Sequence, residues 1–397
     1  MGSEQPLRIA IVAGEESGDL LGADLIRALE QQAGRKIELV GVGGRHLEAL
    51  GLKSLFDANE VALMGISAIL RDLPRLLRRI GQTAKAISQA KPDCLITIDT
   101  PDFSLRVAKK VRAVTPSIPI IHYVCPSVWA WRQGRAAAMR PYVDRILCIL
   151  PFEAGELERL GGPPGTYVGH RLTQDLGVAS AFAAQNRPRD LAPERTKTLL
   201  LLPGSRRSEV GRLLEPFGQT VNELHARGHN LRLMLPTVPH VAPIVEKMVS
   251  NWRQKPEITI TQDEKWQAFG RADAALIASG TVSLELALSG VPMVSCYRLD
   301  PVVKPLAHLL LKVWSGSLPN LIADRAIVPE FYDHLVRPQM LVRQLEALFM
   351  AGAMRDWQKS GFDEVRRRMA TQLPAGEMAA ELVLELVAQK NCRLSNR

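Results

Sequence analysis

The chain has 397 residues, 46% of them apolar, which is enough for two domains of ordinary size with a core in each. Its 50 lysines and arginines outnumber its 41 aspartates and glutamates, and the net charge of +9 favours anionic partners such as phosphates or an anionic lipid surface. Aromatic residues make up only 5% and are not interleaved with basic stretches, so we expect no nucleic-acid partner. No apolar run reaches the roughly 18 residues of a membrane-spanning helix, and neither a signal-peptide core nor a metal-binding cysteine motif is present. These features predict a cytoplasmic protein with peripheral membrane contact at most.

Apolar runs of strand length alternate with amphipathic helical stretches in both halves of the chain. This alternation predicts parallel strands with crossover helices. We therefore predict an α/β fold of two doubly wound, Rossmann-like domains that face a cleft. The predicted divisions are residues 1–173, residues 174–353, which begin with a connecting stretch up to about residue 196, and a mostly helical segment at residues 354–397. The predicted strands lie at residues 7–13, 37–42, 94–98, 118–124, 145–150, 198–202, 231–235, 258–261, 274–278 and 292–297.

The first turn of the chain, at residues 14–19, contains three carboxylates and no G-x-G-x-x-G pattern. Such charges suit a helix start but would repel a phosphate, so a nicotinamide or flavin enzyme is disfavoured. Recognition of a hydroxyl-rich sugar by residues such as Glu15 and Ser17 agrees better with this turn.

A helical pattern follows at residues 64–80, with apolar positions on one face and Arg71, Arg75 and Arg78 on another. Pro74 predicts a kink or a fresh helix start. The segment could be an ordinary core-facing helix, or a basic amphipathic element that lies on an anionic membrane. Residues 302–314 show the same combination of apolar positions at helical spacing with basic residues beside them. The candidate membrane-facing side chains are Ile66, Ile69, Leu70, Leu73, Leu76 and Leu77.

Two polar residues follow the next predicted strands. Asp99 ends the strand at residues 94–98, where partial burial would raise its pKa toward that of a useful general base. Asp102 is the other candidate for the general base, and a loop-capping role is the alternative for both aspartates. His122 lies at the end of the neighbouring strand, where a hydrogen-bonded structural role is the more common one.

The second half holds two strand-to-helix turns that suit a diphosphate. In the first, Gly204 permits a tight turn, Ser205 opens a helix and Arg206 adds a guanidinium group. The second turn has the sequence Ser279-Gly280-Thr281, and Glu285 lies one helical turn later, where its carboxylate can accept bonds from ribose hydroxyls. The alternative for each is a capped helix with a solvated charged side chain.

The sequence resembles the lipid-A-disaccharide synthase family, glycosyltransferases of the two-domain GT-B architecture, over nearly its whole length. The run Ser127-Val128-Trp129-Ala130-Trp131-Arg132 is highly specific to that family. The sequence departs from the family pattern at Glu16, Arg171 and Cys125, where alanine, proline and serine are more usual. The other marks are Ala13-Gly14-Glu15-Glu16-Ser17-Gly18-Asp19, Ile98-Asp99-Thr100-Pro101-Asp102-Phe103, the residues from His122 to Pro126, Leu202-Pro203-Gly204-Ser205-Arg206, Ala278-Ser279-Gly280-Thr281 and Leu318-Pro319-Asn320-Leu321.

The resemblance implies transfer of a diacylglucosamine from UDP-2,3-diacylglucosamine to the 6-hydroxyl of 2,3-diacylglucosamine 1-phosphate, by an inverting displacement without a metal or other cofactor. It implies a donor site in the second domain, an acceptor site in the first, and peripheral attachment to the inner face of the bacterial inner membrane. A final helix that crosses back onto the first domain would suit residues 354–397.

The resemblance also assigns roles to individual residues. Asp99 corresponds to the general base, Arg206 to a phosphate or uridine contact, Glu285 to a ribose contact and Asn320 to a polar cleft residue that would contact the donor. Glu15, Ser17, His122 and Ser127 are the candidates for the acceptor side or the cleft.

Three alternatives remain open on the sequence alone. One is another GT-B enzyme that uses a UDP-amino sugar, such as the undecaprenyl muramyl-peptide N-acetylglucosaminyltransferase or a UDP-N-acetylglucosamine 2-epimerase. Another is a basic nucleotide- or nucleic-acid-binding protein without enzymatic activity. The apolar segments could also meet a second copy of the chain, as in a homodimer, instead of lipid.

Overall fold

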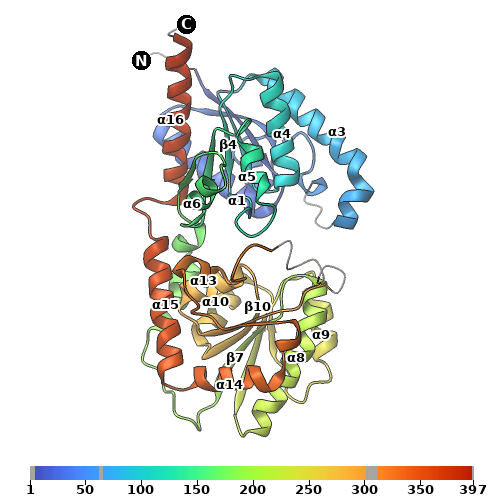
Figure 1. Cartoon of the computed structure of the whole chain (residues 1–397), viewed down its shortest axis with the longest axis vertical. Helices are drawn as coiled ribbons and strands as arrows, with labels where there is room; N and C mark the ends of the chain where they lie inside the picture. Colours follow the sequence, from blue (N-terminus) through green and yellow to red (C-terminus); the bar gives the residue numbers. More distant parts are fainter. Residues whose placement is uncertain (1–4, 62–65, 301–303, 305–310, 396–397) are drawn as a thin grey trace. The chain divides into compact units, whose positions relative to one another are not determined.

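The computed structural model describes residues 5–61, 66–300, 304 and 311–395, with the backbone alone for helical residues 66–72, 391 and 393–395. It separates into two compact units (Figure 1). Met1–Arg171 and Thr371–Arg397 form unit 1, and Leu172–Ala370 form unit 2. Among the described residues, no helix combines the length and the apolar character that crossing a membrane requires.

Unit 1 is a parallel six-stranded sheet in the order β2-β1-β3-β4-β5-β6. Its central strands are buried on both faces, which explains their continuous apolar runs. Helices α1 and α16 pack together on one face, and α3 and α4 cover the other. The strands are β1 (Leu7–Ala13), β2 (Ile37–Val42), β3 (Cys94–Ile98), β4 (Ile120–Tyr123), β5 (Arg145–Cys148) and β6 (Gly165–Tyr167). The helices are α1 (Glu16–Ala33), α2 (Arg45–Glu48), α3 (Ile66–Ala90), α4 (Pro101–Val114), α5 (Gly134–Met139), α6 (Glu153–Arg159) and α16 (Ala375–Ser395).

Unit 2 repeats the architecture with a parallel sheet in the order β12-β11-β10-β7-β8-β9. Its strands are β7 (Lys197–Leu202), β8 (Leu231–Pro236), β9 (Glu257–Thr259), β10 (Ala274–Ala278), β11 (Met293–Tyr297) and β12 (Glu330–Tyr332). Its helices are α7 (Leu176–Gln185), α8 (Arg207–Ala226), α9 (Ala242–Val249), α10 (Gln262–Arg271), α11 (Val282–Ser289), α13 (Leu318–Ala323), α14 (Pro338–Phe349) and α15 (Ala353–Met369).

The two sheets confirm the predicted α/β fold class, but several elements differ from the expectation. The predicted connecting stretch holds helix α7, which packs on α10 and α11. The segment at residues 354–397 is not one unit, because α15 packs on α11, α13 and α14 of unit 2 and only α16 joins unit 1. Of the two outcomes predicted for Pro74, a kink or a fresh helix start, the fresh start is wrong, because helix α3 continues through this residue. Strand β9 ends before Thr261, because the Thr261 hydroxyl accepts a hydrogen bond from Glu264 N and caps α10.

Each sheet has one point at which the strand order reverses, between β1 and β3 in unit 1 and between β7 and β10 in unit 2. The helices that follow two such strands leave toward opposite faces, so a crevice opens beyond the carboxyl ends of the strands. The turns after these four strands are the ones singled out in the sequence, at Gly14, Asp99, Gly204 and Ser279.

Candidate functional site

A cavity of about 430 Å³ lies at the reversal point of unit 2. It is lined by the turns after β7 and β10, and also by the turns after β8 and β9. The structure brings together seven of the eight residues that were predicted for the donor site, all except Asn320. These seven are Gly204, Ser205, Arg206, Ser279, Gly280, Thr281 and Glu285.

The turn after β7 is shaped to accept an anion. Gly204 has φ 112°, and a Cβ there would lie 2.5 Å from Glu209 Oε2, so this position requires glycine. Glu209 Oε2 accepts hydrogen bonds from Ser205 N and Arg206 N, each at 3.2 Å, and the Arg206 guanidinium donates to Glu209 Oε1 at 2.9 Å. A carboxylate of the chain therefore occupies the amides that the sequence suggested for a phosphate, while the Arg206 side chain remains 75% exposed.

A carboxylate and a lysine also line this cavity. Lys265 Nζ lies 3.1 Å from both carboxylate oxygens of Glu285 and 4.0 Å from the centre of the Trp266 ring. Burial raises the pKa of Glu285, although Lys265 acts in the opposite direction. The sequence interpretation missed Lys265, because it weighed the turns after β7 and β10 only. The general rule that ligands bind beyond all the carboxyl ends of such a sheet would have included the turns after β8 and β9.

Asn320 lies outside the cavity and is 1% exposed. Its Oδ1 accepts hydrogen bonds from Ile327 N and Val328 N, at 2.9 and 2.8 Å, and its amide nitrogen donates to Val328 O, Ser315 Oγ and Glu330 Oε2. The expectation that Asn320 contacts a ligand directly is therefore not met, since its amide group is consumed by the chain itself. Its effect on the cavity is indirect: Glu330 holds Gly316 N at 3.0 Å, and Gly316 O accepts a hydrogen bond from Ser279 Oγ at 2.9 Å.

Asp99 lies at the reversal point of unit 1, directly after β3. Both Asp99 and Thr100 have left-handed backbones, with φ values of 47° and 41°, which are unusual for residues other than glycine. The conformation is held because Ser104 donates its hydroxyl to the carbonyl groups of Asp99 and Thr100. Burial raises the pKa of the Asp99 carboxyl, opposed by a hydrogen bond from the Thr100 amide. Such backbone strain beside a half-buried carboxylate with a perturbed pKa is common at active sites.

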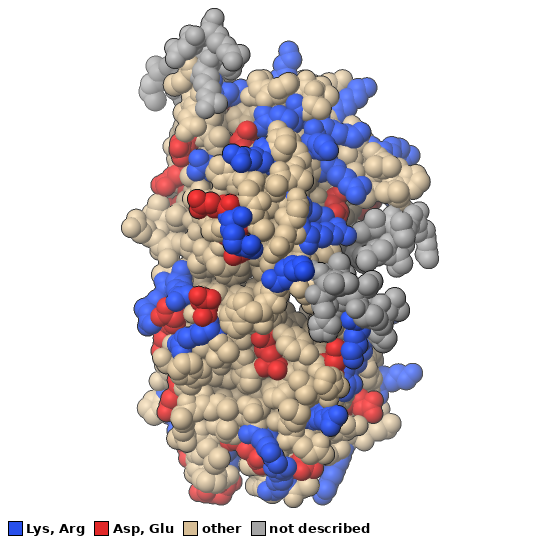
Figure 2. Space-filling view, in the orientation of Figure 1, with Lys and Arg blue, Asp and Glu red and all other residues tan. Residues whose placement is uncertain are grey.

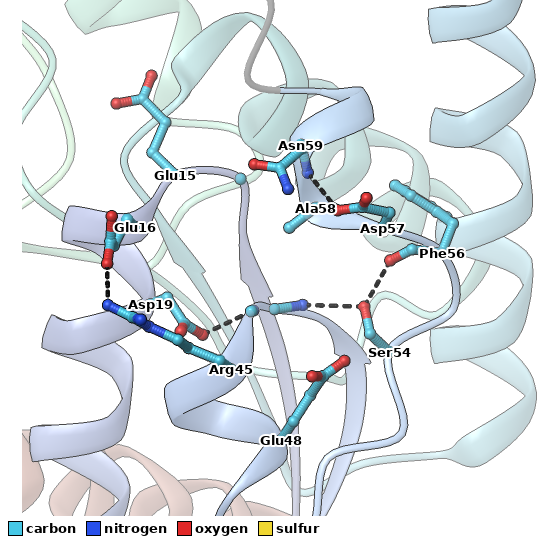
Figure 3. A pocket seen from close by; sticks show the side chains of 13 residues that line it. Glu15, Glu16, Asp19, Arg45, Glu48, Ser54, Phe56, Asp57, Ala58 and Asn59 are labelled. Carbon is cyan, nitrogen blue, oxygen red and sulfur yellow. Dashed lines mark hydrogen bonds and ion pairs between the residues drawn. The ribbon is translucent and has the colours of Figure 1, made fainter. Parts of the chain in front are cut away.

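A second cavity, of about 650 Å³, opens beside this turn (Figure 3). It includes Gly14, where a Cβ would lie 3.0 Å from Thr100 Oγ1. Glu15 lines it, whereas the predicted residue Ser17 is exposed and does not. Asp19 is 2% exposed and accepts hydrogen bonds from the amides at the start of α2, so it has a structural role. The carboxylates around the cavity are Glu15, Glu16, Asp19, Glu48 and Asp57.

The other predicted residues of unit 1 have different environments. His122 is fully buried, its Nδ1 lies 2.8 Å from Thr97 Oγ1, and burial lowers its pKa to about 3. A neutral, buried imidazole agrees with the structural role that was the more common expectation. Ser127 is exposed at the start of the family-specific run, and its carbonyl accepts hydrogen bonds from Ala130 N and Trp131 N.

The structure describes half of the predicted membrane-facing side chains. Those of Ile66, Ile69 and Leu70 lie outside the described residues, as does most of residues 302–314. Leu73 and Leu76 are half-buried, and Leu77 is 47% exposed. Of the predicted arginine stripe, Arg75 binds Glu60 at 2.8 Å, and Arg79, which lies outside that stripe, binds the same carboxylate at 2.8 Å.

One group of side chains in the described part of the chain has the composition of a metal site: Cys125, Cys148 and Glu153, all buried. A hydrogen bond with Cys148 and burial raise the pKa of the Cys125 thiol, and burial raises the pKa of Glu153 to about 7. The Glu153 carboxylate already accepts hydrogen bonds from Ile149 N, Leu150 N and Trp129 Nε1. Because Cys125 and Cys148 also pack in a hydrophobic core cluster of unit 1, we assign this group to the core.

Comparisons with known proteins agree with the two-unit fold. A family model of lipid-A-disaccharide synthetases matches residues 9–381. A lipid-A-disaccharide synthase from Nitrobacter winogradskyi is 43% identical, over 98% of this chain and 97% of its own length.

Solved structures show the same fold at low sequence identity. The glycosyltransferase of kitacinnamycin superposes with a TM-score of 0.61 at 16% identity, over 97% of this chain and all of its own. The UDP-GlcNAc 2-epimerase of Neisseria meningitidis, solved with UDP-GlcNAc, superposes with a TM-score of 0.58 at 12% identity, over 96% of this chain and 100% of its own.

Proposed function

Because the chain belongs to the lipid-A-disaccharide synthase family of glycosyltransferases, we propose that it joins two acylated glucosamines. The donor is UDP-2,3-diacylglucosamine, the acceptor is 2,3-diacylglucosamine 1-phosphate, and the products are a β-1,6-linked disaccharide 1-phosphate and UDP. The observation that carries this proposal is the cavity at the reversal point of unit 2, which is lined both by a turn whose amides bind a carboxylate and by the half-buried Glu285.

The donor nucleotide is assigned to that cavity. The amides of Ser205 and Arg206 already bind a carboxylate, and a diphosphate presents the same kind of acceptor oxygen with more charge. Glu285, held by Lys265, offers acceptor oxygens for ribose hydroxyls. The epimerase from Neisseria meningitidis has this fold and was solved with UDP-GlcNAc, which supports a UDP-sugar as the donor class.

The chemical step is an inverting displacement. The acceptor's 6-hydroxyl attacks the anomeric carbon of the donor sugar, the bond to the UDP oxygen breaks, and Asp99 takes the hydroxyl proton. General-base catalysis of this kind contributes about 10²- to 10⁴-fold to a rate. The negative charge that develops on the leaving UDP is balanced by Arg206 and by the amides at the start of α8.

The experiment that tests this assignment compares Asp99→Asn with the wild type, measuring UDP release in the presence of both acylated substrates. We expect turnover to fall by about 10²- to 10⁴-fold, with UDP affinity unchanged. Because burial raises the pKa of Asp99, the wild-type rate should fall as the pH drops through that raised value, and this limb should be absent in the variant.

Asp102→Asn is the matched control for kcat at saturating acceptor, since this second carboxylate of the turn is paired with Arg135 at 2.7 Å. Near-normal turnover in Asp99→Asn would exclude Asp99 as the base. UDP release that does not require the acceptor would favour an epimerase.

A further inference from the structure

The family-specific run at residues 127–132 has no role in the function proposed so far, and the structure divides it into two parts. One part is anchored in unit 1. Val128 is 1% exposed, Trp129 Nε1 donates to the buried Glu153 at 3.3 Å, and the Trp129 ring meets Phe152 edge-on at 5.2 Å. These contacts fix the backbone on which the second part is displayed.

The second part is Trp131 and Arg132, and it faces solvent. The Trp131 ring is 37% exposed, the Arg132 side chain is 48% exposed, and the guanidinium lies over the ring at 4.3 Å from its centre. Arg132 also has a left-handed backbone, with φ 50°. A strained, non-glycine backbone persists where the surrounding structure enforces it, and such positions are concentrated at ligand sites.

The charge of Arg132 is not fully balanced. Asp102 Oδ1 lies 2.7 Å from Arg135 but 3.7 Å from Arg132, so one carboxylate serves two guanidinium groups. Asp102 is in the first turn of α4, three residues after Asp99. The Arg132 guanidinium, whose charge is not fully balanced, therefore lies within ion-pair distance of the turn that carries the proposed base Asp99.

The cavity beside Gly14 does not supply a positive charge for an anionic group. It is lined by five carboxylates and by Arg45, which is itself paired with Glu16. An anionic group would be repelled there, whereas sugar hydroxyls would find acceptors. A ligand that combines a sugar with a phosphate thus has two separate, complementary surfaces, both in segments that follow the carboxyl ends of unit 1 strands.

We propose that Trp131 and Arg132 form the subsite for the phosphate end of the acceptor, an inference that rests on the proposed function. The Arg132 guanidinium pairs with the 1-phosphate, and the Trp131 ring packs against the sugar face while it holds the guanidinium flat. The pair thereby selects a glucosamine 1-phosphate over the same acylated sugar without phosphate.

The test measures kinetics of the full-length Arg132→Gln variant with two acceptors, 2,3-diacylglucosamine 1-phosphate and 2,3-diacylglucosamine. With the phosphorylated acceptor we expect kcat/KM to fall roughly 10- to 100-fold, as for the loss of a charged hydrogen-bonded pair, mainly through KM. With the unphosphorylated acceptor the variant and the wild type should be equal. Trp131→Ala should raise KM for both acceptors, and Trp131→Phe should restore it.

Arg325→Gln is the matched control, because Arg325 lies over the Trp357 ring at the same 4.3 Å in unit 2. It should leave both acceptors unaffected. Equal losses with the two acceptors, a rise in the donor KM alone, or a change only in binding to anionic vesicles would each overturn the subsite while the proposed function stands. If the wild type releases no UDP on addition of the phosphorylated acceptor, the proposed function fails, and this inference fails with it.

Discussion

Asp99 combines two features that cost stability at a single residue. Its side chain is half-buried, which raises the pKa of its carboxyl, and its backbone is left-handed at φ 47°. Aspartate and asparagine tolerate that conformation better than most residues, because their short side chains can hydrogen-bond locally. An Asp99→Asn substitution therefore keeps the energetic cost of the left-handed backbone and removes only the cost of burying a charged carboxylate.

We predict that Asp99→Asn stabilises the protein at neutral pH. The folded pKa of Asp99 is raised above its unfolded value, so the folded state holds the proton more tightly. The contribution of this group to stability is complete below the unfolded pKa and is lost as the pH rises through the folded pKa. Asparagine cannot ionise, so the melting temperature of the variant should exceed that of the wild type by an amount that grows across this window and then levels off.

Thermal unfolding from pH 4 to pH 8 measures the effect. Asp324→Asn is the control, since Asp324 shares the left-handed backbone at φ 52° but is exposed. A stability difference for Asp99→Asn that does not depend on pH would contradict the assignment.

At the scale of the element, the strand-turn-helix unit formed by β7, Gly204 and α8 contains its own anion. Glu209 lies one turn into α8 and binds the two amides before it, the reciprocal half of a capping box. The arrangement stabilises the start of the helix in the absence of ligand, but it places a carboxylate on the amides that we propose for the diphosphate.

We predict that Glu209→Gln increases the affinity for UDP. Glutamine can still accept the two amide hydrogen bonds, while the removed charge relieves about 1 kcal/mol of repulsion, which corresponds to roughly fivefold in Kd. Isothermal titration calorimetry checks this, with the exposed Glu215→Gln on the same helix as the control. A weaker or unchanged affinity in Glu209→Gln would mean that Glu209 does not compete with the diphosphate.

At the scale of the whole molecule, the last helix of the chain covers part of one face of the unit 1 sheet. Helix α16 packs along α1 closely enough that a Cβ at Gly376 would lie 3.0 Å from Asp24 O. The opposite face carries α3 and α4, and Figure 2 shows basic side chains gathered there. The exposed basic residues on these helices include Arg78, Lys85, Arg106, Lys109 and Lys110.

From this charge distribution we predict that the protein binds vesicles containing anionic lipid, and that binding weakens as salt is added. Leu77→Ser should weaken it by roughly three- to tenfold, because the exposed leucine would lose its apolar contact. Vesicle flotation measures the bound fraction, with Leu176→Ser, an 85% exposed leucine of unit 2, as the control. Equal binding by Leu77→Ser would remove this part of α3 from the membrane contact.

The sequence by itself was sufficient for the α/β class, the doubly wound pattern and the turns that carry Asp99, Gly204 and Ser279. These features depend on local order: apolar runs mark strands that are buried on both faces, and glycine and polar residues mark where they end. The family-specific runs then indicated the family, which the matches to known lipid-A-disaccharide synthases confirm, and suggested the residue roles that we propose.

The tertiary structure alone decided which partner each side chain has. It paired Glu285 with Lys265, placed Glu209 on the amides expected to be free, buried Asn320 within the chain and separated α15 from α16. These outcomes depend on contacts between groups that the pattern of one segment does not specify. Periodicity reports which way a residue faces on its own strand or helix, whereas its hydrogen-bond partner is chosen by whatever the rest of the fold brings within about 3 Å.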